Sequence, residues 1–316
     1  MSVLDRAVSL MLPALPKPVV RFFSRRYIAG PTMEDAFRVV GELADQGAMS
    51  TLDILGELIT STEDALRNAN AYSELIRRVA EDRLAETHVS VKLTALGLLL
   101  DRELCLNHMR RLLERATNAD SFVRIDMEDS SCTSDTLWVY ETLRSEFPGK
   151  IGAVLQSALR RTLDDVDRLT HEPANIRLCK GIYIEPRTVA YTDPEIIRRN
   201  YVLALERMMQ RRIYVGIATH DEPLIWEALR LIRQHSLRPH QYEFQMLLGV
   251  DEELRGILLK AGHRLRVYVP FGEHWYKYSV RRLRENPKIA GYAFKALFHR
   301  RPARGTDLKS VPARFR

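Results

Sequence analysis

The feature that most constrains the fold is an alternation of short apolar runs with longer segments of helical periodicity. The apolar runs have the length of strands and are rich in Val, Ile and Leu, and the segments between them carry apolar residues at three- and four-residue spacing. A chain that repeats strand and helix in this way builds a parallel sheet. The apolar runs begin near Ser50, His88, Ser121, Lys150, Asn175, Arg212, Gln241 and Leu265.

The segments between the runs supply the helices. They are expected at 62–84, 102–116, 133–147, 159–169, 194–211, 222–235 and 251–261. Eight strand units over about 235 residues, without the glycine fingerprint of a dinucleotide site, predict an α/β fold, a parallel (β/α)8 TIM barrel. A doubly wound sheet, which alternates in the same way, is the alternative.

Three parts are expected along the chain. Residues 1–45 form an N-terminal helical arm, which ends in a helix from Thr32 to Ala44 with Thr32 and Asp35 as an approximate capping box. Residues 46–298 form the catalytic barrel. Residues 299–316 form a basic tail whose Pro, Gly and Arg content predicts disorder.

Positive charge is concentrated at the two ends of the chain. Of the net charge of +7, residues 1–30 carry +4 and residues 300–316 carry +5, so the remaining body carries −2. A nucleic-acid enzyme more usually carries basic residues around its working groove, so no nucleic-acid partner is expected. The basic, amphipathic residues 1–30 fit peripheral contact with a membrane surface or packing as an arm on the body, and both interpretations stay open.

Cysteine usage and hydropathy indicate a reducing compartment. The three cysteines are odd in number and none has a second cysteine at metal-ligand spacing, so neither a disulfide framework nor a metal site is expected. No apolar run approaches the roughly 20 residues that span a bilayer, and the N-terminus is a poor signal peptide. We expect a cytoplasmic protein, with peripheral attachment to the inner face of the cytoplasmic membrane left open.

The last apolar run leads into a segment rich in aromatic and basic residues. Pro270 predicts that the strand ends there, and Gly272 predicts a turn before a helix. The adjacent guanidinium groups of Arg281 and Arg282, which lie beyond a strand end, suit a small carboxylate. Taken alone, however, this stretch is more commonly explained by pairing of Arg281 with Glu285 on a solvated face. One broad face of the helix would carry Tyr278, Arg281, Arg282 and Glu285.

Polar side chains stand at the end of every predicted strand. In a (β/α)8 barrel the carboxyl ends of the strands form the active site. Taken singly, Lys92 fits a salt-bridged barrel lysine, Asp126 a structural partner of Arg177, and His220 a helix cap. Together they predict a polar cup for a bulky anionic cofactor and a small carboxylate. The strand-end residues are Glu57, Lys92, Asp126, Glu128, Gln156, Arg177, Lys180, Tyr183, Thr219, His220, Asp221, Glu243, Gln245 and Tyr268.

At these residues the sequence resembles the proline dehydrogenase family in its short, single-function bacterial form. The resemblance runs from about Met33 to Asn286 and is densest in VKLT, RIDMED, RLCKGIYIEP, ATHDE, YEFQMLLG, and RVYVPFG followed by YSVRRLREN. It implies a distorted barrel that binds FAD and oxidises L-proline to 1-pyrroline-5-carboxylate. Hydride would pass from C5 to flavin N5, and the electrons would then pass to a membrane quinone.

The resemblance also implies roles for single residues. Asp126 would support Lys92, Arg177 would lie beside flavin N5, and Glu57 would pair with a substrate arginine in the empty site. The expected catalytic residues are Asp126, Arg177, Lys92 and Tyr183. The proline carboxylate and ring would be bound by Lys92, Tyr268, Tyr278, Arg281 and Arg282. FAD would be contacted by Met127, Gln156, Arg177, Lys180, Gly181, Ile182, Thr219, His220 and Gln245.

Two positions bear on specificity. Ile182 stands where many members of the family carry a small alanine, and Tyr268 is the position that favours proline over 4-hydroxyproline. The alternatives are a dehydrogenase of another cyclic amino acid, such as 4-hydroxyproline, and a non-catalytic membrane-associated barrel. A pyrroline-5-carboxylate dehydrogenase is the expected functional partner, because it would consume the product.

Overall fold

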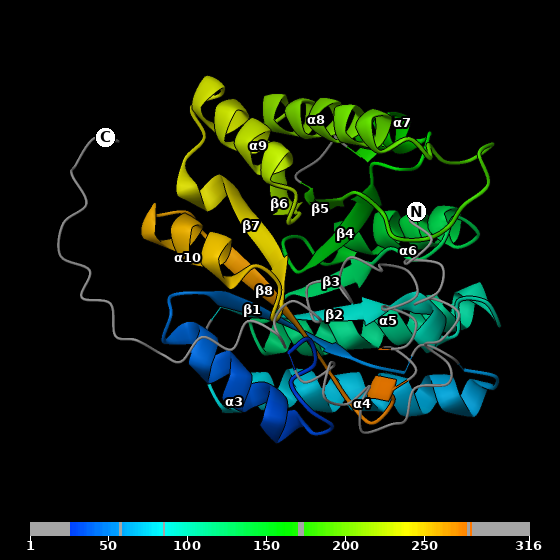
Figure 1. Cartoon of the computed structure of the whole chain (residues 1–316). Coiled ribbons are helices and arrows are strands. Elements are labelled where there is room, and N and C mark those ends of the chain that lie inside the picture. Colours follow the sequence, from blue (N-terminus) through cyan, green and yellow to red (C-terminus); the bar gives the residue numbers. More distant parts are fainter. Residues whose placement is uncertain (1–25, 57–58, 85, 170–173, 277–278, 280–316) are drawn as a thin grey trace, which may run out of the picture.

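Eight parallel strands close into a barrel in chain order, β1 to β8 (Figure 1). This closed parallel sheet confirms the expected (β/α)8 class. The computed structural model describes residues 26–56, 59–84, 86–169, 174–276 and 279. The strands are β1 Met49–Ile54, β2 Thr87–Lys92, β3 Val123–Asp126, β4 Ile151–Gln156, β5 Asn175–Cys179, β6 Tyr214–Ala218, β7 Tyr242–Leu247 and β8 Leu265–Phe271.

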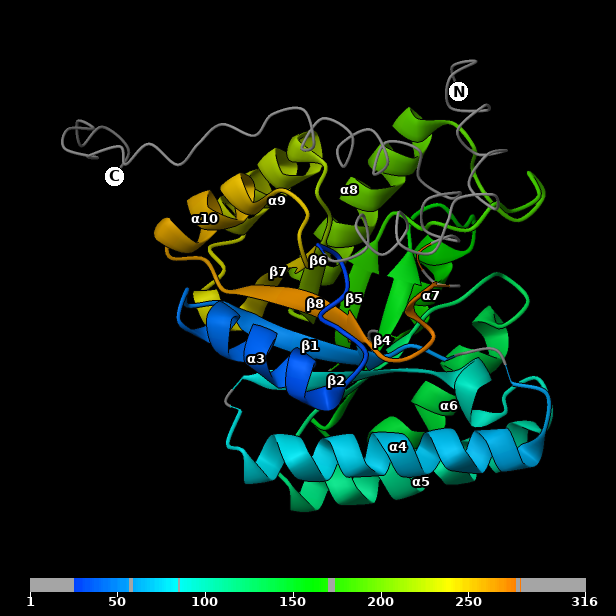
Figure 2. The same cartoon turned by 60° about the horizontal axis from the view of Figure 1, so that its bottom comes forward.

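Helices between the strands form the outer ring of the barrel (Figure 2). Each begins within three residues of its predicted start, because helical periodicity and the flanking caps are local signals. Short 3-10 helices at Leu93–Leu96 and Pro239–Gln241 interrupt two connections. The helices are α4 Thr62–Glu81, α5 Arg102–Asn118, α6 Thr133–Glu146, α7 Thr162–Leu169, α8 Pro194–Gln210, α9 Glu222–Gln234 and α10 Glu252–Lys260.

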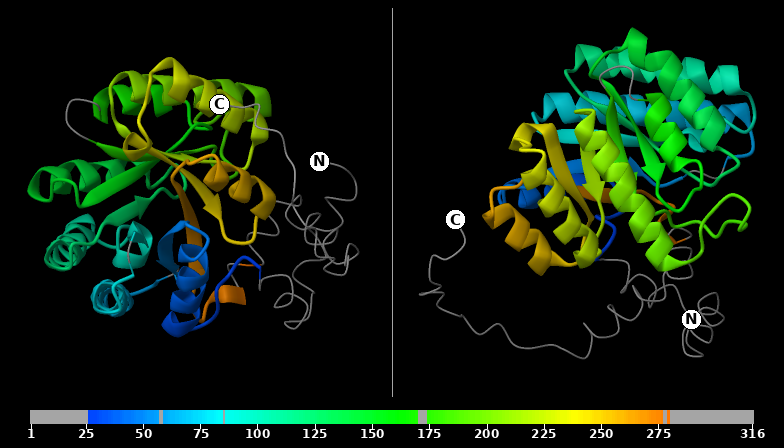
Figure 3. Two further views of the ribbon diagram at one scale, coloured as in Figure 1. Left: turned by 90° about the vertical axis from the view of Figure 1, so that its left-hand side faces the viewer. Right: turned by 90° about the horizontal axis from the view of Figure 1, so that it is seen from above.

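The barrel closes between its first and last strands. Thr51 of β1 pairs with His88 of β2 on one side and with Tyr268 of β8 on the other. Helix α3 (Met33–Ala44) packs against β1 and β8 and covers this seam from outside, as the end-on view shows (Figure 3). The capping box predicted for α3 is present, since Thr32 accepts from the Asp35 amide and Asp35 accepts from the Thr32 amide.

The prediction that Pro270 ends the last strand is wrong. β8 continues through Pro270 to Phe271, and Pro270 is in register with Asp53 of β1. The Pro270 carbonyl accepts from the Ala29 amide at 2.9 Å, on the side that faces away from β1. A proline is tolerated where its missing N–H points away from a ladder partner, and the last residue of β8 that β7 pairs with is Tyr268.

The hydrophobic core lies between the barrel and its helices. Outward strand residues such as Leu52, Val89, Ile125 and Val267 are fully buried there. The residues that alternate with them point into the barrel, where many are charged. Within the described ranges, no helix combines the length and apolarity needed to cross a membrane.

Candidate active site

The interior of this barrel is held together by polar contacts. A (β/α)8 barrel is usually filled by layers of Val, Ile and Leu. Here Tyr268 on β8 donates to Asp126 on β3, and Arg177 on β5 donates to Gln245 on β7. These strands are not neighbours, so the contacts cross the lumen. The site therefore rests on the closure of the barrel.

Lys92, the last residue of β2, is the cation at the centre of the upper lumen. Its Nζ lies 2.8 and 2.7 Å from the two carboxylate oxygens of Asp53 on β1. Asp126 is more distant, with Oδ2 at 3.9 Å from Nζ, and the Tyr268 hydroxyl lies at 3.4 Å. The resemblance pointed to Asp126 as the support of Lys92, whereas Asp53 makes the short contact.

Asp53 is the site residue that sequence reasoning missed. It lies inside the first apolar run and is fully buried, so the apolar pattern of the strand hides its charge. A signal was available, because a charged residue in an inward position of one strand needs a partner of opposite charge. Lys92 lies on the next strand, one inward position beyond Ser90, which is the residue in register with Asp53.

Asp126 joins three strands through its carboxylate. Oδ1 accepts from Arg177 at 2.6 Å and from Ser90 at 2.7 Å, and Oδ2 accepts from Tyr268 at 2.7 Å. Burial alone would raise the pKa of Asp126, but Arg177 and Lys92 outweigh it and hold the pKa below its usual value. The carboxylate is therefore ionised, and it fixes both Arg177 and Tyr268.

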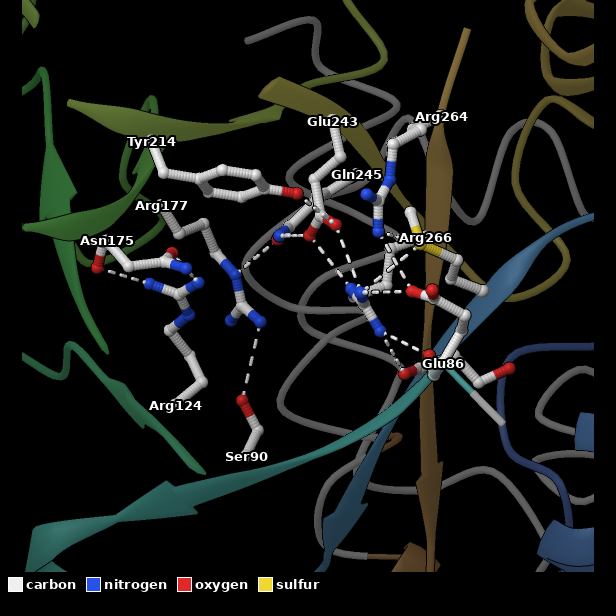
Figure 4. A network of polar contacts seen from close by, with 12 residues as sticks. Glu86, Ser90, Arg124, Asn175, Arg177, Tyr214, Glu243, Gln245, Arg264 and Arg266 are labelled. Atoms are coloured by element: carbon white, nitrogen blue, oxygen red, sulfur yellow. Dashed lines mark hydrogen bonds and ion pairs between the residues drawn. The ribbon is translucent and has the colours of Figure 1, made fainter. Parts of the chain in front are cut away.

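A second polar layer lies below this cluster (Figure 4). The prediction that Glu243 stands at a strand end is wrong, because it is the second residue of β7 and lies at the amino end of that strand. Glu243 accepts from Arg266 on β8 at 2.8 and 3.1 Å, and its pKa is held well below the usual value because Arg266 outweighs the effect of burial. Arg124 is fully buried and bonds the Asn175 carbonyl. Glycines make room for these long side chains: an added Cβ at Gly152 would overlap the Arg124 guanidinium.

Gln156 and Gly181 come together at the rim. The Gln156 amide donates to the Glu128 carbonyl at 2.7 Å. Gly181 follows β5 with φ at +100°, and an added Cβ there would lie 2.9 Å from the Gln156 side-chain oxygen. The backbone conformation therefore favours glycine at this position.

His220 presents a buried donor without a partner among the described residues. Its Nε2 accepts from the Leu247 amide at 2.9 Å, which places the proton of the neutral ring on Nδ1. Nδ1 is buried and has no hydrogen-bond partner in the described part of the chain. Burial lowers the pKa of His220 to about 4, so the ring is neutral at pH 7. An acceptor oxygen of a ligand would satisfy this N–H group.

Two cations converge on Asp221 beside this histidine. Asp221 accepts from Lys180 at 2.7 Å and from Arg198 at 3.0 Å, and its amide donates to Thr219 Oγ1 at 3.0 Å. Burial raises the pKa of Asp221, but the two cations outweigh it and the pKa lies below its usual value. Lys180 and Arg198 are both part-exposed, so a ligand phosphate can share them.

The structure brings most of the expected site residues to one end of the barrel. Lys92, Asp126, Arg177, Tyr268 and Gln245 form one network, while Gln156, Lys180, Gly181, Thr219 and His220 line the ends of β4 to β6. Met127 is buried just after β3, and Ile182 and Tyr183 are half-buried after Gly181. The following expected residues and segments lie outside the described residues: Glu57, Tyr278, Arg281, Arg282, residues 1–25, the C-terminal helix and the tail 299–316.

This donor set fits FAD. The rim offers cations for a pyrophosphate, a glycine without a side chain, and the buried N–H group of His220, which has no partner among the described residues. The lumen below offers Arg177, held rigidly by Asp126 and Gln245. A flat, polar and anionic ligand is what such a combination accommodates.

Comparison with known proteins gives one consistent result. The sequence model of the family described as proline dehydrogenase matches residues 36–293. Proline dehydrogenase 1 of Bacillus subtilis (strain 168) is 36% identical over 277 residues, which is 88% of this chain and 91% of that protein. Proline dehydrogenase of Deinococcus radiodurans is 35% identical over 278 residues, or 87% of this chain and 89% of that protein.

Longer relatives match over part of their length. The bifunctional protein PutA of Escherichia coli (strain K12) is 26% identical over 84% of this chain and 23% of its own. The crystal structure of proline utilization A from Bdellovibrio bacteriovorus, inactivated by N-propargylglycine, superposes with a TM-score of 0.78 and 26% identity, covering 83% of this chain and 32% of that one.

Proposed function

Because the chain belongs to the proline dehydrogenase family, we propose that it oxidises L-proline to 1-pyrroline-5-carboxylate with FAD as cofactor. The observation that carries the proposal is the buried cluster of Asp53, Lys92, Asp126, Arg177 and Tyr268. It lies at the strand ends that bind substrates in barrel enzymes. It provides a cation for the substrate carboxylate and a second cation for charge that develops in the reaction.

Lys92 would bind the proline carboxylate together with Arg281 and Arg282. Its ammonium is held at 2.7 and 2.8 Å by Asp53, so it is oriented before substrate arrives. Tyr268, whose hydroxyl is fixed by Asp126, would form one wall for the pyrrolidine ring and Tyr278 another. The ring carbon C5 would then face the cofactor, and Tyr268 would leave no space for a 4-hydroxyl group.

FAD, when bound, would supply the hydride acceptor for C5 of proline. It would be held by Met127, Gln156, Arg177, Lys180, Gly181, Ile182, Thr219, His220 and Gln245. Arg177 would stabilise the negative charge that reaches the cofactor, since charge stabilisation by a fixed cation costs no reorganisation. The geometry of the lumen supports this role, because Asp126 and Gln245 hold the buried Arg177 guanidinium from two sides.

The remaining expected participants are Tyr183, a membrane quinone and a second dehydrogenase. Tyr183 lies two residues after Gly181 and would act beside the cofactor. Electrons would pass to a membrane quinone through peripheral contact of the protein with the membrane, for which the basic residues 1–30 are suited. A pyrroline-5-carboxylate dehydrogenase would take up the product.

The test is a visible absorption spectrum of the purified protein before and after anaerobic L-proline. The expected result is a flavin spectrum that bleaches with L-proline and persists with 4-hydroxyproline. Flavin bands that persist with L-proline would overturn the substrate, and a protein that stays colourless after incubation with FAD would overturn the cofactor. N-propargylglycine, with which the Bdellovibrio relative was inactivated, is expected to inactivate this protein as well, and excess L-proline is expected to slow the inactivation.

A further inference from the structure

A chain of hydrogen bonds runs from Arg177 into the lower lumen (Figure 4). Arg177 Nε donates to Gln245 Oε1 at 2.5 Å, and Gln245 Nε2 donates to Glu243 Oε1 at 2.5 Å. Glu243 in turn accepts two hydrogen bonds from the Arg266 guanidinium. Arg177 is thus held by Asp126 on one side and by this chain on the other.

The Gln245 amide has one favourable orientation in this chain. Its oxygen faces the Arg177 guanidinium, which only donates, and its NH2 group faces the Glu243 carboxylate, which only accepts. Turning the amide over would set NH2 against N–H and oxygen against oxygen. The Glu243 charge therefore determines which atom Gln245 presents to Arg177.

Glu243 itself is anchored as an acceptor of four hydrogen bonds. Oε1 accepts from Arg266 Nε and Gln245 Nε2, and Oε2 accepts from Arg266 Nη2 and the Tyr214 hydroxyl. Arg266 Nη1 is fixed on the carbonyls of Ser50 and Glu86 at 2.8 and 2.6 Å. Glu243 is fully buried, one inward position below Gln245 on β7. It is too deep for a substrate that binds at the strand ends.

Gly216 on β6 leaves the space that Gln245 occupies. An added Cβ at Gly216 would lie 2.5 Å from Gln245 Nε2 and 2.9 Å from its Cδ. These atoms are the far end of a flexible side chain, which can move aside at low cost. An alanine at this position would therefore displace the Gln245 amide while leaving the charges of the lumen in place.

We propose that Glu243, anchored by Arg266, is a positioning residue that orients the Gln245 amide and through it holds the Arg177 guanidinium for the reaction. This inference rests on the proposed function of Arg177. A purely architectural ion pair would tie β7 to β8 without affecting Arg177. The two roles differ in whether the effect of a Glu243 substitution on kcat depends on the presence of Arg177.

The kinetic test compares Glu243→Gln in two backgrounds. An amide has one acceptor oxygen and would point NH2 at donors, so the variant should lower kcat about tenfold and change the KM for proline less than about twofold. In the Arg177→Lys background, the same substitution should change kcat less than about twofold, because Lys cannot present Nε–H in a fixed plane. Glu86→Gln, a matched change at an exposed carboxylate 4.0 Å from Arg266, should leave both constants unchanged.

A second readout needs neither cofactor nor substrate. In [15N]arginine-labelled apo protein, the Arg177 Nε–H signal is assigned by its loss in Arg177→Lys. Its hydrogen exchange should be about tenfold faster in Glu243→Gln and unchanged in Glu86→Gln, because the short bond to Gln245 is weakened. Equal losses of kcat in both backgrounds, or unchanged exchange, would overturn the proposal. A protein that neither binds FAD nor oxidises proline would instead overturn the proposed function, and the exchange test would still stand.

Gly216→Ala covers the case in which Glu243→Gln does not fold. Circular dichroism and thermal unfolding establish that each variant is native. Gly216→Ala should reproduce the loss of kcat in the wild-type background and show little further loss with Arg177→Lys. Wild-type kcat and Arg177 exchange in a folded Gly216→Ala protein would contradict a role for the Gln245 amide.

Discussion

Lys92 lies between two carboxylates at unequal distances. Asp53 makes two hydrogen bonds to its ammonium, while the Asp126 oxygen is 3.9 Å away and is occupied by Tyr268. The two carboxylates therefore have different roles. Asp53 balances the lysine, and Asp126 organises the arginine and tyrosine on the other side of the lumen.

Asp53→Asn should lower the free energy of unfolding by about 3 kcal/mol, because removing one partner of a buried ion pair leaves the other poorly compensated. Chemical denaturation of the purified variant measures the loss. The matched control is Asp120→Asn, which removes a carboxylate that is 96% exposed beside Lys150 and should have no measurable effect. Equal stability of the two variants would contradict the assignment of Asp53 as the main partner of Lys92.

At the scale of elements, the barrel closes where its first strand, β1, pairs with its last strand, β8. Helix α3 covers the seam between β1 and β8, burying Ala36, Val39, Val40 and Leu43. The chain just before it bonds the end of β8, through Ala29 to Pro270 and Gly272 to Gly30. The N-terminal elements therefore hold in place the strand that carries Tyr268.

Thr32→Ala should lower the free energy of unfolding by about 1 kcal/mol, because it removes the side-chain acceptor of the α3 capping box. Thr142→Ala is the matched control in a helix interior. Within the described part of the chain, its hydroxyl donates to the Trp138 carbonyl one turn back in the same helix, so the change should stay within about 0.5 kcal/mol. Urea unfolding curves of the two variants decide the point, and an equal effect would argue against a stabilising cap.

In the molecule as a whole, apolar strand residues face outward from the barrel toward the helices, and charged strand residues face the barrel interior. Burial of neutral histidines adds a pH dependence to this arrangement. The pKa values of His88, His220 and His263 are all lowered by burial, so the unfolded chain binds protons that the folded chain does not. Stability is then fully present above the unfolded pKa of about 6.5 and is lost as pH falls toward the folded pKa.

His220 alone should account for about 2 kcal/mol of stability lost between pH 7.5 and pH 5, given a folded pKa of about 4. His220→Gln keeps an acceptor for the Leu247 amide and removes the titration. The difference in unfolding free energy between wild type and variant should therefore narrow by about that amount as pH falls. A constant difference for His220→Gln would contradict its burial as a neutral ring.

The sequence by itself determined the order of the strands and helices, the starts of the helices to within three residues, and the presence of polar residues along the strands. These are local properties, since periodicity and caps are set by residues a few positions apart. The tertiary structure decided which of these polar groups meet. Tyr268 bonds Asp126 across 142 positions of sequence, and Asp53 bonds Lys92 across 39. Such pairings depend on how the barrel closes and staggers its strands, and alternation along one strand carries no information about that closure.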